Sequence, residues 1–443
     1  MSETHHSARI VVAGAGLAGA LMAIYLARAG HEVLVYERRS DPRAKGFIGG
    51  RSINLALSTR GIAALEKAGL ADKVLADAIP MRGRMMHSAQ SELTFQPYSA
   101  RSDRAINSVS RGGLNLTLLE VADSYDNVSL HFDQRCEDID FENTTAIFTG
   151  PDGQTHRVSA DAIIGADGAF SAVRTAMQKT DRFDYSQSYL EHGYKELHIP
   201  PEDDGDFAME PNALHIWPRG GSMMIALPNK DRSFTCTLFW PYEGDHAFAA
   251  IREESDVLPF FRKHYPDAVP LMPTLVEDYQ RNPVSSLVTI RCWPWTRNLT
   301  LILGDAAHAI VPFYGQGMNC AFEDCAALDV CLRQHPGDIP AAFHALEELR
   351  KRHADAIADL ALDNFIEMRD KVGSKAFLLK KKGEKLLSRL FPKRFLPLYD
   401  MVSFSTIPYD DARRRARAQS SIVRAAVSTA ALIILLVAVA IIF

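Results

Sequence analysis

Residues 10–19 of the chain read IVVAGAGLAG, a β-prone apolar run that leads into three glycines with the spacing G-x-G-x-x-G. A helix-favouring sequence comes next, and residues 31–37, HEVLVYE, have the pattern of a second strand. This order predicts a buried strand, a tight turn, a helix and a parallel strand. In such a unit Gly14 allows the tight turn, Gly16 lets the backbone approach a pyrophosphate, and Gly19 lets the helix pack closely on the strand.

The same stretch has a second interpretation, because residues 10–27 are eighteen consecutive apolar or glycine residues, long enough for a membrane span by hydropathy alone. The three glycines and the charged strand that follows favour the buried strand–helix–strand unit, whose elements are apolar on all sides. Glu37 closes the second strand, where a carboxylate can bind a ribose 2′-hydroxyl and would repel the 2′-phosphate of NADP. The segment therefore predicts one dinucleotide site, for FAD or NAD, and nothing downstream repeats the fingerprint.

Length and composition limit the class of protein. The 443 residues correspond to about three domains at roughly 150 residues each, or to two large lobes with an appendage. With 47% hydrophobic and 23% charged residues, the chain is neither collagen-like nor wholly disordered. The net charge of −5 argues against a dedicated nucleic-acid binder, which needs a basic surface. The six cysteines contain no C-x-x-C pair, so we expect reduced, mostly buried thiols and no metal site.

Charge is distributed unevenly along the chain. Residues 371–424 contain 14 Lys or Arg against four Asp or Glu, a balance of +10 that leaves −15 for residues 1–370. Residues 425–443 contain no charged side chain. As a helix with a rise of about 1.5 Å per residue they would span about 28 Å, close to the hydrocarbon thickness of a bilayer. The alternative is a buried C-terminal helix, but such helices normally have polar positions on one side. We therefore expect a C-terminal membrane anchor beside a basic neck.

Two further segments have the character of cofactor turns. ADAIIGADG at 160–168 predicts a buried strand that ends in a glycine-rich turn with Asp167. A second apolar strand ends in GDAAH at 304–308, which contains Asp305, and GQGMN at 315–319 opens another helix. An acid at the end of a strand, beside glycines and a helix N-terminus, suits the hydroxyl groups of a ribose or ribityl chain. Each segment taken singly is also a plausible turn.

The motifs GAGLAG, GADG and GDAAH occur in this order in the FAD-dependent aromatic hydroxylases of the para-hydroxybenzoate hydroxylase type, and the chain resembles that family. Within the family it is most similar to the branch that hydroxylates L-kynurenine. This likeness covers nearly the whole chain and rests on GRSINLALSTRG at 50–61, HGYKELHIPP at 192–201, AMEPNALHIWPR at 208–219, MMIALPN at 223–229, FTCTLF at 234–239, VPFYGQGMN at 311–319, NFIEMRD at 364–370 and LPLYDMVSFS at 396–405. The basic neck and hydrophobic end are similar to the eukaryotic members.

The resemblance implies a monooxygenase of tryptophan degradation. NADPH would reduce a tightly bound FAD, O2 would add to the reduced flavin, and the hydroperoxide would transfer one oxygen to the kynurenine ring. NADPH would bind transiently, since no second nucleotide domain is present. The protein would position the ring and exclude water, so no catalytic side chain is assigned, and His308 is expected to be structural or close to the flavin. Alternatives are another aromatic hydroxylase, a dehydrogenase or reductase of the same fold, and an interaction protein that merely kept the fold.

The resemblance also implies particular cofactor contacts. Glu37 and Arg38 would lie beside the adenosine ribose, and Asp305 would bind the ribityl chain. Met318 and Asn319 would contact the isoalloxazine edge through backbone groups. Arg111 would lie near the flavin phosphates or ring, and the remaining expected FAD contacts are Gly14, Gly16, Leu17, Gly19, Ala56, Cys136, Asp167 and Gly317.

For the substrate, the resemblance implies a carboxylate-binding pair, Arg84 and Tyr98, supported by Asn364 and Tyr399. The residue types alone also fit a surface arginine on a strand and tyrosines in the core or at its rim. A carboxylate in an apolar pocket needs a planar bidentate donor, which arginine supplies. Tyr314 is a departure, since a Phe is more usual at this position in the family.

Together these segments predict an α/β architecture in which a Rossmann-like FAD-binding domain is interleaved with a β-sheet substrate domain. Polar and apolar positions alternate in the substrate segments, which favours a mixed or antiparallel sheet over the flavin. The resemblance places the catalytic body in the cytoplasm and, in a eukaryote, the anchor in the mitochondrial outer membrane. The predicted domains are the FAD-binding domain (1–74, 106–182 and 291–340), the substrate domain (75–105 and 183–290), a helical region (341–410), and the neck with its anchor (411–443).

Overall fold

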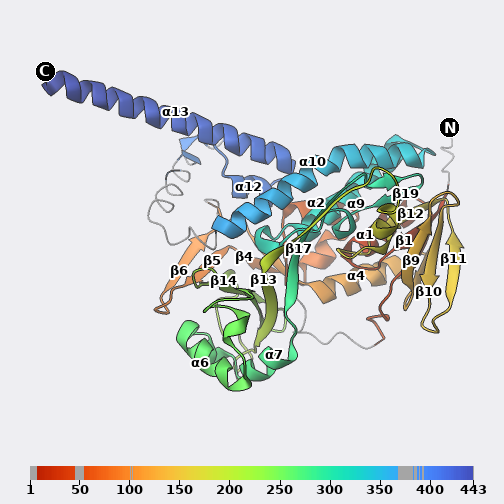
Figure 1. Ribbon diagram of the computed structural model, residues 1–443, viewed down its shortest axis with the longest axis horizontal. Coiled ribbons are helices and arrows are strands. Elements are labelled where there is room, and N and C mark those ends of the chain that lie inside the picture. Colours follow the sequence, from red (N-terminus) through yellow and green to blue (C-terminus); the bar gives the residue numbers. More distant parts are fainter. Residues whose placement is uncertain are drawn as a thin grey trace.

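The computed structural model of the chain describes residues 7–44, 54–99, 101, 103–367, 383, 387–388, 390–391 and 394–442, with side chains for all of these except 426–427 and 430–442. The body has two interleaved lobes, and a long C-terminal helix projects from it (Figure 1). The beginning of the GRSIN run, the end of the NFIEMRD run and most of the predicted anchor lie outside the described residues or side chains.

The first lobe is built on a six-stranded sheet with the order β18-β19-β12-β1-β2-β8. Its central strand β1 (Arg9–Ala13) pairs in parallel with β2 (Glu32–Tyr36) on one side and with β12 (Ala162–Gly165) on the other. Helix α1 (Leu17–Arg28) connects β1 to β2 and is almost entirely buried, which confirms the predicted strand, turn, helix and strand. The outer strands are β8 (Val128–His131), β19 (Thr300–Ile302) and β18 (Thr296–Arg297).

Helices and a second small sheet cover the two faces of this sheet. α1 packs against α4 (Arg111–Asp123) and α9 (Gly317–Gln334), and α9 in turn packs against α2 (Thr59–Lys67). A three-stranded sheet contributes Phe148, whose ring stacks on Tyr36 at a centroid distance of 4.1 Å. The strands of that sheet are β9 (Arg135–Asp140), β10 (Thr145–Thr149) and β11 (Thr155–Ser159), and the short helices of this lobe are α3 (Ala71–Leu75), α5 (Ala172–Met177) and α8 (Asp305–His308).

The glycine turn is packed too tightly for side chains at two of its three positions. A Cβ at Gly19 would lie 1.9 Å from the Gly14 carbonyl oxygen, and a Cβ at Gly14 would lie 2.6 Å from the Ala166 carbonyl oxygen. Gly14 also has a φ of +101°, which disfavours any other residue. A Cβ at Gly16 would meet nothing within 4 Å. Gly14 and Gly19 are therefore required by the packing of the chain itself, whereas Gly16 faces open space.

The second lobe is a seven-stranded mixed sheet with the order β17-β13-β16-β15-β14-β5-β6. Strand β5 (Gly83–His87) runs parallel to β14 (Ala213–Pro218), and the other described pairs are antiparallel. One face packs against α6 (Glu254–His264) and α7 (Leu275–Arg281) around Trp240. The remaining strands are β6 (Leu93–Pro97), β13 (Asp184–Ile199), β15 (Met223–Pro228), β16 (Phe234–Pro241) and β17 (Ser285–Trp293), and two 3-10 turns occupy Phe248–Ala250 (η1) and Val269–Leu271 (η2).

A small sheet joins the two lobes. It has the order β3-β7-β4, from Asn54–Leu57, Ile106–Ser110 and Ile79–Met81. The Asn54 amide and the Ser108 hydroxyl both donate to the Pro228 carbonyl oxygen of β15, each at 2.9 Å. These buried hydrogen bonds set the position of the larger sheet relative to the first lobe.

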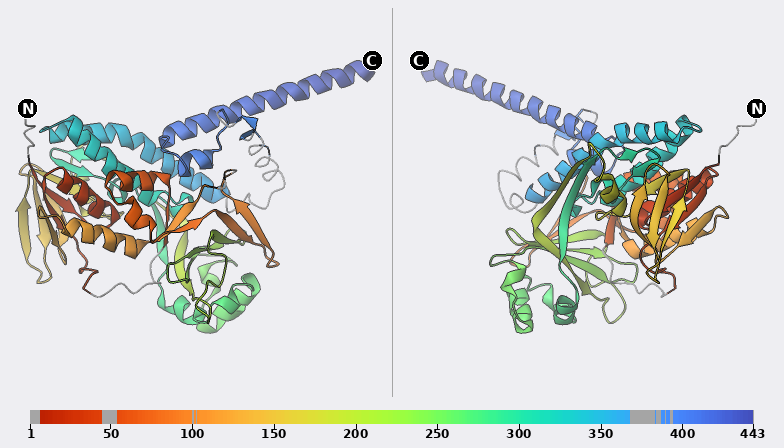
Figure 2. Two further views of the ribbon diagram at one scale, coloured as in Figure 1. Left: turned by 180° about the vertical axis from the view of Figure 1, so that it is seen from behind. Right: turned by 45° about the vertical axis from the view of Figure 1, so that its right-hand side comes forward.

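The C-terminal helices lie across the other face of the seven-stranded sheet and then leave the body. α10 (Ile339–Ile366) packs against α9, against the 3-10 turn η3 (Pro312–Tyr314) and against the start of α13 (Tyr409–Ile442). α12 (Leu398–Ser403) lies beside the root of α13. The rest of α13 extends away from the body in every view (Figures 1 and 2). Among the described residues, no helix is both long and apolar enough to cross a membrane.

The glycine packing generates a stability prediction. In a Gly19→Ala variant the added Cβ cannot fit without moving α1, so we expect the free energy of unfolding to fall by about 1–3 kcal/mol and the melting temperature by several degrees. Gly16→Ala is the matched control, because its Cβ enters open space and should leave the melting temperature of the apoprotein unchanged. Equal melting temperatures for the two variants would contradict this account of the turn.

Candidate active site

The three predicted cofactor turns meet at one edge of the six-stranded sheet. They follow β1, β12 and β19, which are adjacent and parallel, so their carboxyl ends lie together. The Ala166 amide donates to the Ala13 carbonyl at 2.8 Å, and the Leu303 amide donates to the Gly165 carbonyl at 3.0 Å. This edge of an open α/β sheet is where ligands bind. Leu17 begins α1 at the same edge and is partly exposed.

Glu37 lies just after β2 with its carboxylate against the glycine turn. It accepts hydrogen bonds from the Ala15 amide at 2.9 Å and from the side chain of Arg39 at 2.9 Å. Burial raises the pKa of Glu37, but the bonds from Arg39 and Ala15 outweigh it, so the pKa is lowered and the group is ionised. The ion pair is thus made by Arg39, which the sequence reasoning missed, while Arg38 is exposed beside it. The alternation of polar and apolar residues along β2 gives no information about Arg39, because this side chain folds back onto Glu37 after the strand has ended.

Asp167 follows β12, beside the Gly14 turn. Its Oδ2 accepts from the Ala172 amide at 2.7 Å, whereas its buried Oδ1 has no hydrogen-bond partner among the described residues. Burial raises the pKa of this carboxyl. Cys136 on β9 is close enough for the charge of Asp167 to add to the effect of burial in raising the thiol pKa. Cys136 is a free, partly buried thiol, and the other five cysteines are free and buried.

The residues at this edge fit an FAD. The open space at Gly16 admits a pyrophosphate, the unpaired oxygen of Asp167 can accept a hydroxyl hydrogen, and Asp305 is exposed in the first turn of α8. Arg111 is exposed at the start of α4, and its charge opposes the effect of burial in raising the pKa of Glu196 on β13. Arg111 therefore lies between the two lobes.

Arg174 connects two of the cofactor turns and was not predicted as a site residue. Its buried guanidinium donates to the Ala306 carbonyl and to the Ala169 carbonyl, both at 2.7 Å. The first carbonyl belongs to the GDAAH segment and the second follows GADG. The sequence around Arg174 shows only an arginine near a helix start, so nothing local could have indicated this role.

The start of α9 is held by the side chain of Asn319. Its amide nitrogen donates to the Ala56 and Gly315 carbonyls, each at 2.8 Å, and its oxygen accepts from the Ser58 amide at 2.9 Å. Gly315 is so close to β3 that its Cβ would lie 3.0 Å from that of Ala56. The Asn319 side chain is thus fully used in joining β3 to the loop before α9. Gly317 and Met318 are the first two residues of that helix.

Behind these turns lies a buried cluster of charged groups. The Asp324 carboxylate contacts His308 Nε2 at 2.5 Å, Arg350 Nε at 2.7 Å and the Gly304 amide at 3.2 Å. Burial alone would raise the pKa of Asp324, but the charges of His308 and Arg350 outweigh it and lower the pKa. The structure thus places His308 in a structural contact that fixes the turn carrying Asp305.

The predicted substrate residues Arg84, Tyr98 and Tyr399 come together, the first two from the β5–β6 hairpin and the third from α12. The Arg84 guanidinium carbon is 5.6 Å from the Tyr98 ring centroid and 5.1 Å from that of Tyr399. The two rings stack at a centroid distance of 5.4 Å, and Tyr314 also stacks on Tyr399, at 5.7 Å. We refer to Arg84, Tyr98, Tyr314 and Tyr399 as the arginine–tyrosine cluster.

The arginine–tyrosine cluster has the electrostatic character of an anion site in apolar surroundings. Arg84 Nε is buried and has no hydrogen-bond partner among the described residues. Burial raises the pKa of Tyr98 and Tyr399 despite the nearby guanidinium, so both phenols remain neutral hydrogen-bond donors. The surrounding apolar side chains include Met81, Ile106, Leu227 and Ala56. Ala56 also contacts the loop before α9, so the cluster adjoins the cofactor site.

Asn364 has a different position from the other predicted substrate residues. It lies on α10 and donates to the Phe313 carbonyl oxygen at 2.6 Å. Phe313 precedes Tyr314 in η3, and its ring stacks on Phe365 at 4.3 Å. Through this bond Asn364 supports the turn that carries Tyr314.

The bonds of Asn319 lead to a prediction about cofactor affinity. An Asn319→Ala variant removes the partner of two partly buried carbonyls and of one buried amide, at a cost of about 1–3 kcal/mol for each group, and frees the loop before α9. Asn127→Ala is the matched control, because that amide also bridges two carbonyls, those of Ala27 and His31, away from the loop. Both variants should unfold at lower temperature, but only Asn319→Ala should raise the dissociation constant for FAD, measured by flavin fluorescence. Equal FAD affinities would contradict the role of the side chain.

The comparisons with known proteins agree with this geometry. Residues 7–337 match the family model described as FAD binding domain. The chain is 48% identical over 411 residues to a kynurenine 3-monooxygenase of Myxococcus xanthus, covering 92% of this chain and 88% of the relative. It is 48% identical over 426 residues to a kynurenine 3-monooxygenase of Dictyostelium discoideum, covering 93% and 92%. The solved tetrameric form of 2-methyl-3-hydroxypyridine-5-carboxylic acid oxygenase shares the fold, with 22% identity, a TM-score of 0.68, and coverage of 84% of this chain and 95% of that one. The chain therefore belongs to the kynurenine 3-monooxygenase family of FAD-dependent monooxygenases.

Proposed function

We propose that this chain uses FAD, NADPH and O2 to hydroxylate L-kynurenine at position 3 of its ring, a step in tryptophan degradation. The observation that carries the proposal is the arginine–tyrosine cluster beside Ala56. L-Kynurenine combines an α-carboxylate with an aniline ring, and the cluster offers a cation and neutral phenols within an apolar wall. The family membership supports the same activity.

The residues of the chain would act mainly by binding and orientation. When bound, FAD supplies electron transfer from NADPH and the activation of O2. Arg84 would hold the substrate carboxylate in a charge-assisted, bidentate hydrogen bond, with Tyr98 and Tyr399 as further donors. Met81, Ile106 and Leu227 would exclude water from the ring. The amino group of the substrate, next to the carbon that is hydroxylated, activates the ring itself, so positioning can suffice without a protein base.

The direct test follows NADPH oxidation by the purified holoenzyme with and without L-kynurenine. We expect L-kynurenine to accelerate NADPH oxidation and most of the NADPH consumed to be matched by 3-hydroxykynurenine, with a small remainder released as hydrogen peroxide. A dehydrogenase or reductase of the same fold would show no oxygen incorporation from O2 into the product. Acceleration by another aromatic acid, but not by L-kynurenine, would replace the proposed substrate.

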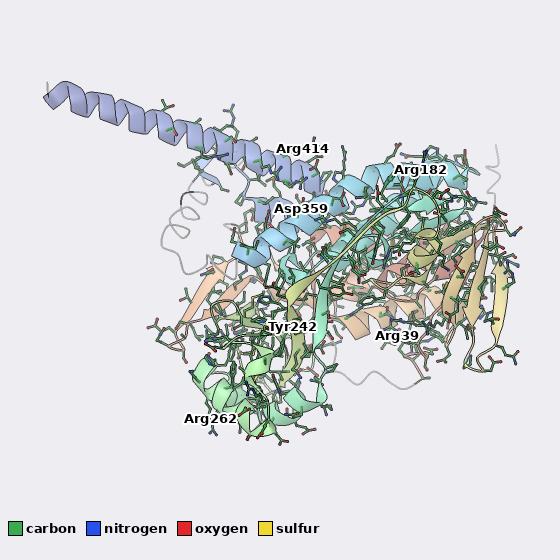
Figure 3. All side chains as sticks on the ribbon, viewed as in Figure 1. Arg39, Arg182, Tyr242, Arg262, Asp359 and Arg414 are labelled. Atoms are coloured by element: carbon green, nitrogen blue, oxygen red, sulfur yellow. The ribbon has the colours of Figure 1, made fainter. Side chains whose placement is uncertain are left out.

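Arg84→Ala should weaken substrate binding without weakening FAD binding. Removing one partner of a desolvated ion pair costs about 2–5 kcal/mol, so we expect the dissociation constant for L-kynurenine to rise by roughly 30-fold or more. Arg262→Ala is the matched control, because it removes the same charge from an exposed site on α6, at the bottom of the view in Figure 3. A comparable loss of FAD affinity in Arg84→Ala would contradict the carboxylate role.

We also propose that residues 425–443 anchor the protein in a membrane with its body in the cytoplasm, and in a eukaryotic cell in the mitochondrial outer membrane. The absence of charge in this stretch and the basic residues before it support the proposal. The direction of α13, which leads away from the body, is compatible with it (Figure 2). The bound headgroups would be anionic, since the basic neck would lie against them.

Two truncations test the anchor and separate it from the folded body. Deletion of residues 425–443 should release the protein from the membrane fraction and leave FAD binding intact. Deletion of residues 409–443 should instead destabilise the body, because Tyr409 and Ala412 are fully buried and Arg413 pairs with Asp359 at 2.6 Å. Persistent membrane association after the shorter deletion would contradict the anchor.

A further inference from the structure

Tyr409, at the root of α13, makes a buried hydrogen bond to the loop before α9. Its hydroxyl donates to Gln316 Oε1 at 3.0 Å. Gln316 is buried and directly precedes the first residue of α9. The Ser58 hydroxyl also donates to that oxygen, at the longer distance of 3.5 Å. Burial raises the pKa of Tyr409, so its hydroxyl keeps the proton that it donates.

Arg60 holds Tyr409 in this position. Its guanidinium carbon lies 3.9 Å from the Tyr409 ring centroid, a cation–π contact in a dry environment. The same guanidinium donates to the Val402 carbonyl at 2.7 Å, and to the carbonyls of Met401 and Ile407. Arg60 thus ties α2 to α12 and to the segment that follows it.

Arg60 also belongs to a buried chain of charges that reaches the cofactor turns. It pairs with Glu323 of α9 at 2.9 Å, and Glu323 pairs with Arg350 at 3.2 Å. Arg350 pairs with Asp324, which contacts His308 in the GDAAH segment. A buried network of this kind is costly unless every member has its partners, so it holds one geometry. The root of α13 is therefore connected both to the loop before α9 and to the GDAAH turn.

The start of α9 lies between the cofactor turns and the arginine–tyrosine cluster. A Cβ at Gly304 would be 3.2 Å from the Ala321 Cβ, and Asn319 bonds to the Ala56 carbonyl. A flavin that is bound at the cofactor edge, with its ring reaching the arginine–tyrosine cluster, would therefore lie against the start of α9. The unpaired amides at a helix N-terminus stabilise negative charge, so a small displacement changes how readily the ring accepts electrons.

We propose that Tyr409 and Arg60 are positioning residues for the flavin. They act through Gln316 and set the place of the α9 N-terminus against the ring. The inference rests on the proposed function in one respect, that FAD occupies this edge. It adds that the root of α13 belongs to the flavin-binding structure, in addition to any role as a membrane stalk.

The experiment compares Tyr409→Phe with wild type as purified holoenzymes. The variant keeps the ring over Arg60 and loses only the hydroxyl. We expect a shift in the midpoint reduction potential and in the visible absorption bands of the bound flavin. We also expect the hydrogen peroxide released per NADPH, the product of O2 reduction without hydroxylation, to rise roughly 2- to 10-fold, the effect of one hydrogen bond.

Tyr265→Phe is the matched control. Its buried hydroxyl accepts from Trp240 Nε1 at 3.0 Å, in the core between the seven-stranded sheet and α6. Both variants should unfold at slightly lower temperature, but only Tyr409→Phe should move the flavin potential. A Gln316→Met variant and the double variant complete a cycle, in which the two changes should be strongly non-additive.

Three results would overturn the proposal: an unchanged potential in Tyr409→Phe, an equal shift in Tyr265→Phe, or additive effects in the double variant. These results can be told apart from failure of the proposed function. The flavin potential and spectrum are measured without substrate, so they report on the flavin even if L-kynurenine is not the substrate. Failure of the flavin to bind wild-type protein would instead reject the cofactor assignment.

Discussion

The close approach of the Gly14–Gly19 turn to the strand β12 is the constraint on which the rest of the structure depends. Gly19 allows α1 to lie over the turn, and Gly14 allows the turn to touch Ala166. Because β12 is then held beside β1, its neighbour β19 follows in parallel, and all three cofactor turns reach one edge. Side chains at Gly14 or Gly19 would separate elements whose alignment forms the dinucleotide site.

Helix α9 connects the edge of the sheet where the cofactor turns meet to the region of the arginine–tyrosine cluster. Its first turns hold Asn319, which joins β3, and Glu323 and Asp324, which join α2, α10 and the GDAAH turn. Charges that are buried need partners, and each partner here comes from a different part of the chain. The same side chains that satisfy one another therefore set the distances between α9 and these elements. Among the described residues, the buried polar atoms of the site that have no partner include Asp167 Oδ1, Arg84 Nε and Arg174 Nε.

The sequence predicted the first lobe well because its signals are local. The spacing of three glycines, the apolar runs and the acid after β2 all lie within 28 residues, and the structure confirms the strand, helix and strand that they predict. Arg39 and Arg174 were missed because each folds back onto backbone or carboxylate groups that no periodicity indicates. The prediction that Arg84, Tyr98 and Tyr399 bind the substrate came from the resemblance alone. The residue types do not distinguish a binding site from the protein surface, where arginine and tyrosine also occur on strands.

By itself, the sequence determined the dinucleotide-binding unit, the order of the cofactor turns and the uneven distribution of charge between residues 1–370 and 371–424. Each of these features depends only on residues that are close together in the chain. Only the tertiary structure decided that Arg84 meets Tyr399 and that Tyr409 meets Gln316. Such contacts join residues far apart in the chain, and their formation depends on how whole elements pack. Packing also decided that the start of α13 belongs to the core, because the buried Tyr409 and the paired Arg413 are fixed by their neighbours, not by the composition around them.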